Sequence, residues 1–266
     1  MTATPQSQID AVRTYWESHV DDWKIATHVA GSAEFFRETE HYRFEKLHYL
    51  NDHVPIEGSD TGTVLEVGCG LGNDLSRFAK HGSTVTGIDL TNRSVELCRE
   101  NFAQRKLAGT FVEMNGEDLQ FDNDSFDYVY CHTVLQFTPD PQKMVDEIQR
   151  VLKPGGTALI MALNKNSWLM LMHRLFKVKI DYLDSPVYNL FSKKEFEQLL
   201  AGFDNVEAFS ERFPVRTKVH KGVKALIYNA LFVDLFNLLP KALTRFSGHH
   251  LLAYVRKNDQ VSAHAA

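Results

Sequence analysis

VLEVGCGLGNDLSRFAKHG, residues 64–82, begins as an apolar run and passes through three closely spaced glycines into an amphipathic helical pattern. Parallel α/β sheets place the loop after the first strand at the point where ligands bind. Glycines in such a loop let a ligand lie against bare backbone amides at the start of the next helix. The stretch therefore predicts a site for a nucleoside-bearing cofactor.

The glycine spacing separates this loop from the dinucleotide fingerprint. The glycines are Gly68, Gly70 and Gly72, and Asn73 stands where the third glycine of GxGxxG would be. A dehydrogenase is therefore disfavoured, although the loop alone does not name the cofactor.

Residues 63–161 alternate between short β-branched runs and helical spacing, which is typical of βαβ units on a parallel sheet. Strands are expected at 63–67, 84–88, 110–113, 126–131 and 157–161, and helices at 72–80, 92–106 and 141–151. The sequence KPGG, residues 153–156, is expected to end the last helix and turn the chain into the next strand. Further along, a helix is expected near 192–202, and strands at 205–212 and 249–257. The fold class is thus α/β, with a doubly wound, mostly parallel sheet of seven strands.

The flanks of this pattern differ from it. Residues 1–60 read as a helical, aromatic N-terminal lid, 61–163 as the cofactor-binding core, and 164–266 as the completion of the sheet, all in one structural domain. The last part carries two apolar inserts, 164–191 and 214–247, which are expected to form a cap over the substrate and to determine specificity. Within the second, residues 225–243 form an apolar pattern with a narrow polar stripe, which favours a helix docked on the sheet or cap. A cavity for an apolar substrate and a membrane-surface helix are the alternatives.

Composition restricts the partners. A formal net charge of −5, with 44% hydrophobic and 24% charged residues, is ordinary for a globular protein and argues against nucleic acid. The three cysteines form no metal-ligand or disulfide pattern, so no metal is expected and a cytoplasmic location fits. Neither a leader nor a membrane-spanning run is recognisable, and the sequence carries no signal for the oligomeric state.

Three further elements follow the glycine loop in order. VTGIDL ends the second predicted strand at Asp89, a long segment follows as EMNGEDLQFDNDSFDYVYCHTVLQFTPD (113–140), and RVLKPGGTAL (150–159) comes last. Together with Glu66 they make residues 63–162 resemble the class I S-adenosylmethionine-dependent methyltransferases, particularly those that act on small molecules. The resemblance implies a Rossmann-like fold, S-adenosyl-L-methionine as cofactor and S-adenosyl-L-homocysteine as product.

The resemblance also assigns cofactor contacts. Glu66 and the loop from Gly68 to Gly72, with Cys69, would line the methionine and ribose, and Asp89 would accept the ribose hydroxyls. The remaining contacts would be made by Leu90 on the adenine, by Asn115, Gly116 and Glu117 at its edge, and by Cys131 and His132 at the end of the fourth strand. The family usually has Asp where this chain has Asn115, whose amide oxygen can still accept a hydrogen bond.

The catalytic candidates are fewer. His132 leaves a strand end toward the predicted site and can titrate near neutrality, so it is a candidate base, with a structural role as the alternative. Tyr15, and less so Trp16, are candidates to close over the sulfonium, with packing on the sheet as the alternative. Cys131 is expected to be a core residue and not a nucleophile. Gln136 stands where similar enzymes commonly have His, which removes one proton acceptor.

The resulting prediction is methyl transfer to a small organic molecule at O, N, S or C, by in-line displacement at the sulfonium. The alternatives are a methyltransferase that acts on protein or RNA, and a non-catalytic module that binds S-adenosylmethionine.

Overall fold

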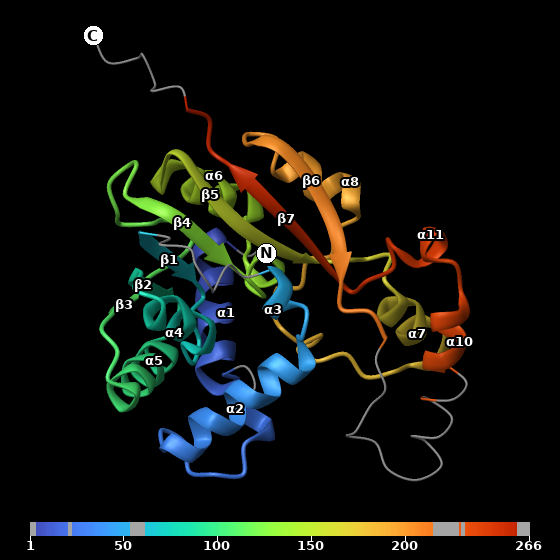
Figure 1. Cartoon of the computed structure of the whole chain (residues 1–266), viewed down its shortest axis with the longest axis horizontal. Helices are drawn as coiled ribbons and strands as arrows, with labels where there is room; N and C mark the ends of the chain where they lie inside the picture. Colours follow the sequence, from blue (N-terminus) through green and yellow to red (C-terminus); the bar gives the residue numbers. More distant parts are fainter. Residues whose placement is uncertain (1–3, 21–22, 54–61, 215–228, 230–231, 260–266) are drawn as a thin grey trace.

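The computed structural model describes residues 4–20, 23–53, 62–214, 229 and 232–259. Its centre is one seven-stranded sheet in the order β3-β2-β1-β4-β5-β7-β6 (Figure 1). The strands are β1 (Thr63–Val67), β2 (Thr84–Asp89), β3 (Thr110–Glu113), β4 (Phe126–Cys131), β5 (Leu152–Leu163), β6 (Asp204–Glu211) and β7 (His250–Arg256). All neighbours pair in parallel except β7, which runs antiparallel to both β5 and β6. The predicted α/β sheet is confirmed.

Helices cover both faces of the sheet (Figure 1). On one face, Phe196 of α8 (Lys193–Leu199) and Ile148 of α6 (Pro141–Val151) share a buried cluster with Leu65 of β1. On the other face, Phe78 of α4 (Asn73–Lys80) and Phe102 of α5 (Asn92–Arg105) share a buried cluster with Val64. The side chains of adjacent residues 64 and 65 serve opposite faces because strand side chains alternate.

Most predicted boundaries agree with the structure to within two residues, because capping residues mark the helix starts. Thr91 caps α5 and Asp140 caps α6, each with its side chain accepting a backbone N–H. The KPGG segment differs from the prediction. It lies within β5, which begins at Leu152, and the register against β4 shifts between Phe126 and Tyr128, so these residues form an irregularity in the strand rather than a turn before it.

The N-terminal helices are α1 (Pro5–Ser18), the 3-10 turn η1 (Trp23–Ile25), α2 (Ala33–Lys46) and α3 (Leu50–His53). Two contacts join α1 to the end of β2 and the start of α5. Arg13 Nε donates to the Leu90 carbonyl at 3.2 Å, and the Glu17 carboxylate accepts from the Asn92 backbone N–H at 3.0 Å. The N-terminal segment is therefore held at the edge where β1 and β2 end.

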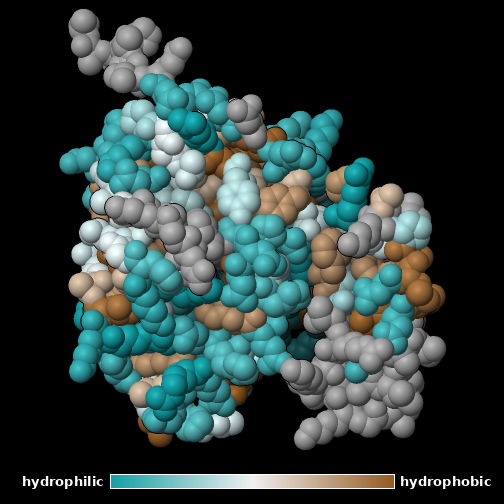
Figure 2. All heavy atoms as spheres, viewed as in Figure 1, coloured by the Kyte–Doolittle hydropathy of each residue, from teal (hydrophilic) through white to brown (hydrophobic). Residues whose placement is uncertain are grey.

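The C-terminal inserts contain α7 (Trp168–Phe176), α10 (Asp234–Leu238) and α11 (Lys241–Thr244). Residues 225–228 and 230–231 of the predicted apolar helix lie outside the described residues. In the described part, α10 ends before Pro240, and Leu235 and Leu238 are 62% and 80% exposed. The expectation that this segment is one helix with most of its surface buried is therefore wrong for residues 234–244. Exposed apolar side chains, among them Leu235 and Leu238, gather on the surface at α10 (Figure 2).

Within the described residues, no helix has the length and apolar character needed to cross a lipid bilayer.

Candidate active site

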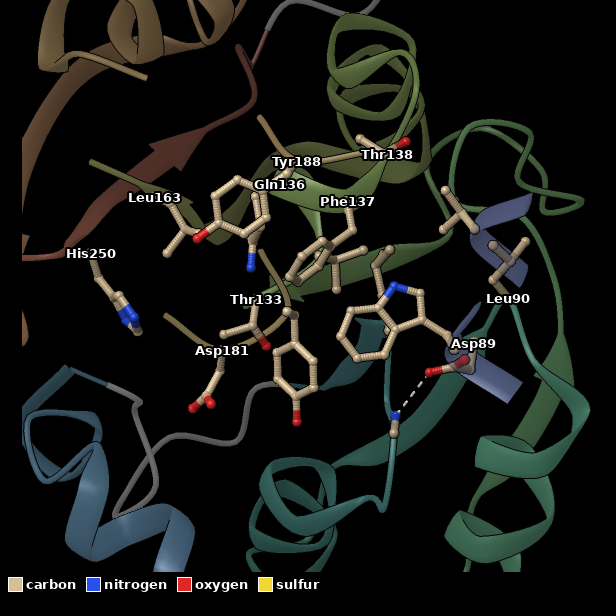
Figure 3. Close-up of a pocket in the computed structure, with 18 of the residues that line it drawn as sticks. Asp89, Leu90, Thr133, Gln136, Phe137, Thr138, Leu163, Asp181, Tyr188 and His250 are labelled. Carbon is tan, nitrogen blue, oxygen red and sulfur yellow. Dashed lines mark hydrogen bonds between the residues drawn. The ribbon is translucent and has the colours of Figure 1, made fainter. Parts of the chain in front are cut away.

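A cavity of about 560 Å³ lies at the carboxyl ends of β1, β2 and β4. Its walls come from the glycine loop, the segments after β2, β3 and β4, the N-terminal helix α1, and the C-terminal inserts. Figure 3 shows Asp89 and Leu90 at one end of it and His250 and Leu163 toward the other. The cavity thus joins the predicted cofactor loop to the last third of the chain.

The glycine loop presents backbone to this cavity. The backbone N–H groups of Gly68 and Cys69 both donate to the Ile88 carbonyl at 2.8 Å, which fixes the loop against β2. Gly70 has a φ of +49°, and a Cβ there would meet no heavy atom within 4 Å. Since Gly70 lines the cavity, any side chain would occupy the space in which a ligand would lie.

Asp89 ends β2 with its carboxylate in the cavity wall. Oδ2 accepts from the Gly70 N–H at 3.1 Å, and Oδ1 accepts from the Thr91 N–H at 3.0 Å and from its hydroxyl at 2.8 Å (Figure 3). Burial raises the pKa of Asp89 above its usual value, against the effect of these hydrogen bonds. The carboxylate is therefore held in one orientation between the glycine loop and the cavity.

The predicted cofactor residues divide into two groups. Six line the cavity: Gly68, Gly70, Asp89, Leu90, Asn115 and Gly116. The others lie behind its wall. Gly72 packs against Cys98, and Cys69 and Cys131 are buried in the core. Glu117 does not line the cavity, and its Oε1 accepts from the Thr138 hydroxyl and from the Asp140 N–H.

Glu66 lies behind the glycine loop and is 4% exposed. Its Oε2 has no hydrogen-bond partner among the described residues. Burial and the nearby Asp74 carboxylate raise the pKa of Glu66 well above its usual value. A buried carboxyl oxygen without a partner is costly, and the raised pKa lessens this cost because it favours the neutral, protonated carboxyl.

His132 does not line the cavity but belongs to a buried polar chain that leads to it. Arg43 forms a bidentate ion pair with Asp74, at 2.8 and 2.5 Å, and also contacts His132 Nδ1 at 3.3 Å. His132 Nε2 contacts the Tyr49 hydroxyl at 2.8 Å, and this hydroxyl contacts His250 Nδ1 at 2.5 Å. His250 does line the cavity. His132 therefore connects to the cavity through Tyr49 and His250.

The two aromatic residues of α1 are placed differently. Trp16 lines the cavity and contacts Phe137 and Tyr182, with ring centroids 4.7 and 4.9 Å apart. Tyr15 does not line it, because its hydroxyl donates to Asp184 at 2.9 Å and its ring stacks on His19. The sequence favoured Tyr15 over Trp16 as the aromatic lid residue, whereas the structure places Trp16 at the cavity.

The sequence predicted that the C-terminal inserts cap the substrate, but it did not identify the polar residues at the far end of the cavity. Arg212, His249, His250 and Trp168 line it, although they are up to 82 residues apart in the chain. The available signal was the HHLL start of the last predicted strand, which pairs antiparallel with β5 and so begins where β5 ends, with His250 opposite Leu163. The pairing of two strands that lie far apart in the sequence cannot be predicted from residue spacing.

The three cysteines are buried, unpaired side chains. Burial raises the pKa of Cys131 to about 12, so its thiol is protonated at neutral pH and is not a nucleophile.

A family model described as "Methyltransferase domain" matches residues 65–160. An uncharacterized protein of Methanocaldococcus jannaschii is 31% identical over 190 residues, which are 71% of this chain and 84% of that protein. The ubiquinone biosynthesis O-methyltransferase of Coxiella burnetii is 31% identical over 121 residues, which are 46% of this chain. The chain spans about half the length of this second relative, 50%.

A solved structure from Thermotoga maritima, described as an S-adenosylmethionine-dependent methyltransferase and possible histamine N-methyltransferase, shares the fold. It superposes with a TM-score of 0.61 at 17% identity, covering 93% of this chain and 100% of that one. The sheet order, the open glycine loop beside Asp89 and these matches agree with one another: the chain belongs to the class I S-adenosylmethionine-dependent methyltransferase family.

Proposed function

We propose that this chain transfers the methyl group of S-adenosylmethionine to a small organic molecule. The observation that carries the proposal is that one cavity contains both an open glycine loop beside Asp89 and a second end lined by side chains from the C-terminal inserts. A bound cofactor and an acceptor would thus share one cavity, as in-line displacement requires. The O-methyltransferase name of the Coxiella burnetii relative agrees with this reaction class.

The residues present fit the cofactor. Asp89 would accept the ribose hydroxyls, Gly70 leaves the room that the cofactor needs, and Asn115 and Gly116 border the adenine. Asn115 Oδ1 already accepts from the Glu117 N–H at 3.0 Å, which orients its amide. Glu66, which the resemblance places at the methionine, does not line the cavity, so no cofactor contact is assigned to it.

S-adenosylmethionine supplies an electrophilic methyl group on a sulfonium, and the chain needs only to position and shield it. Trp16, Phe137 and Tyr182 form an aromatic wall in the middle of the cavity. Aromatic faces attract cations and exclude water. We assign His132 a positioning role, since it holds Tyr49 and through it His250.

A cavity of about 560 Å³ favours a small acceptor over a protein or RNA segment. The net charge of −5 also weighs against nucleic acid. Three unpaired cysteines support a reducing compartment such as the cytoplasm. Residues 1–60 would act as a lid, because α1 contributes Val12 and Trp16 to the cavity wall.

Calorimetric titration with S-adenosylhomocysteine tests the proposal. Asp89→Ala should weaken binding by about 1–3 kcal/mol, the cost of losing a buried hydrogen-bonding partner. Asp122→Ala, an exposed carboxylate in the loop before β4, is the matched control and should leave the affinity unchanged. Equal affinity of both variants and the unmodified protein would refute this cofactor site.

A further inference from the structure

The end of the cavity remote from Asp89 has predominantly apolar walls. Leu163, Trp168, Leu169 and Met172 contribute to it, from the end of β5 and from α7. Such a lining accommodates the hydrocarbon body of a ligand. The few polar side chains in this apolar wall therefore select the polar substituents of the ligand.

Arg212 brings a positive charge to this apolar end. No carboxylate of the described residues lies within 4.0 Å of its guanidinium. The adjacent Glu211 instead pairs with His53 at 3.0 Å, and Asp181, which also lines the cavity, pairs with Lys24 at 2.6 Å. In the sequence, residues 215–228, which the structure does not describe, contain four Lys or Arg and no Asp or Glu. Arg212 therefore lacks a counter-ion in the described chain.

His250 does not neutralise this charge. An Arg212 N–H donates to His250 Nε2 at 2.9 Å, and since a guanidinium can only donate, Nε2 must be the unprotonated nitrogen. Burial, together with Arg212, lowers the pKa of His250 well below its usual value, so the ring is neutral. A guanidinium carries five N–H donors, and His250 is the one hydrogen-bond partner that the described residues provide.

The backbone of Arg212 is held in an uncommon conformation. Its φ is +58°, in the left-handed region that non-glycine residues rarely adopt. Its carbonyl oxygen accepts from Trp168 Nε1 at 2.9 Å and from the His249 N–H at 3.2 Å. Two other residues that line the cavity thus fix the position of Arg212, as is common where strain serves a site.

Two more polar groups of the cavity wall have unused hydrogen-bonding capacity. Gln136 is 2% exposed, and its Oε1 has no hydrogen-bond partner among the described residues. The buried hydroxyl of Tyr188 likewise has no hydrogen-bond partner among them. Figure 3 shows both side chains in the same part of the cavity as Leu163. Buried polar groups normally have partners, so their state indicates a ligand that carries oxygen or nitrogen.

We propose that Arg212 binds a carboxylate of the methyl acceptor, whose apolar body occupies the chamber of Leu163, Trp168 and Met172, with Tyr188 as a second donor. The acceptor is then a small lipophilic acid. This inference rests on the proposed function, because it names the substrate class of the same cavity. The Arg212 guanidinium supplies charge-assisted hydrogen bonds to the acid, and no chemical step is assigned to it.

The test uses octanoate and its uncharged analogue octanamide, each titrated into protein saturated with S-adenosylhomocysteine. Octanoate should bind saturably and at least about tenfold more tightly than octanamide, as expected for a charge-assisted hydrogen bond. Arg212→Gln should abolish that preference, and Tyr188→Phe should reduce it by about threefold. Lys194→Gln, an exposed cation of α8 that does not line the cavity, is the matched control and should preserve it.

Three results overturn the proposal. One is equal binding of octanoate and octanamide by the unmodified protein, a comparison that needs no variant to fold. Another is an Arg212→Gln protein that binds octanoate normally. The third is an Arg212→Gln protein that loses affinity for S-adenosylhomocysteine alone, because the arginine would then serve the cofactor carboxylate. If the unmodified protein fails to bind S-adenosylhomocysteine, the proposed function fails, and the same titrations on the free protein still decide the role of Arg212.

Discussion

The two ends of the cavity are built in different ways. At the end that contains Asp89, the lining comes from successive loops of one βαβ series, and backbone groups make the main contacts: Gly70 offers open space and its N–H orients the Asp89 carboxylate at 3.1 Å. At the other end, Arg212, His250 and Trp168 come from separate segments and act through their side chains. The Asp89 end is thus formed by loops between consecutive elements, and the acceptor end by segments that are distant in the sequence.

This difference separates features that are common to the fold from features that determine the substrate. The glycine loop is set by a strand that runs into a helix, which is a local arrangement common to the family. The acceptor end depends on where the inserts bring their side chains, and loops and inserts are where specificity resides in a shared fold. A buried polar chain from Asp74 of α4 through Arg43, His132 and Tyr49 leads to His250 at the acceptor end.

The first prediction concerns the buried polar chain that leads to the acceptor end. Arg43→Met removes the partner of Asp74, whose side chain is 2% exposed, and should lower the free energy of unfolding by about 3–5 kcal/mol, as for other broken buried pairs. Arg43 holds the pKa of Asp74 below its usual value although burial acts in the opposite direction. Urea denaturation at pH 7.5 measures the loss.

Arg37→Met is the matched control, because Arg37 lies on the same helix and pairs with Glu34 at 2.7 Å on the surface. An exposed pair contributes little, so this variant should lose at most about 0.5 kcal/mol. Similar losses in both variants would contradict a larger contribution of the buried Arg43–Asp74 pair than of the surface pair.

The second prediction breaks the Asp89 end alone. Gly70→Val should weaken S-adenosylhomocysteine binding by more than about 100-fold, near 2.7 kcal/mol, because the side chain fills the ligand space. Gly82→Val is the control. Gly82 also has a positive φ, +92°, and a Cβ there would likewise meet no heavy atom within 4 Å, but it lies on the surface after α4. Calorimetry should show normal affinity for the control, and a loss there as well would point to backbone strain.

The third prediction concerns the acceptor end. Burial first and Arg212 second lower the pKa of both His249 and His250 well below 6.5. The unfolded chain therefore binds protons below about pH 6.5 that the folded chain does not, so stability falls as the pH drops through that value and is unaffected above it. Between pH 6.5 and 5.5 each histidine should cost up to about 1.4 kcal/mol.

Urea midpoints at pH 7.5, 6.5 and 5.5 check this dependence. His249→Asn should reduce the slope by about half, whereas His81→Asn, at the exposed end of α4, should not alter it. A slope that is the same in both variants and the unmodified protein would contradict neutral buried histidines at this end.

The smallest effect is expected between the ends. Trp16→Ala should weaken S-adenosylmethionine binding by about tenfold, the scale of a partly desolvated cation–π contact. Tyr15→Phe should change the affinity by less than about twofold, because the Tyr15 hydroxyl donates to Asp184 outside the cavity lining. A larger loss of affinity in Tyr15→Phe than in Trp16→Ala would identify Tyr15 as the lid residue.

Much of the fold followed from local patterns. The bounds of β1, β3 and β4 match the expected ranges, because β-branched runs between turn residues mark strands clearly. The length of β5 was not predictable, since residues 153–156 belong to the strand through an irregularity that its neighbours impose. The candidate base His132 faces Tyr49 and Arg43, which are more than 80 residues away in the chain.

The order of residues 63–162 was enough to specify an α/β sheet, the glycine loop and the carboxylate at Asp89, because each depends on φ/ψ preferences and side-chain periods within a few residues. The acceptor end required the folded chain. β7 is antiparallel and inserted between β5 and β6, and this places His250 beside Leu163 and brings Arg212 to the same edge. Contacts of that range are set by how whole elements pack, which no local pattern encodes.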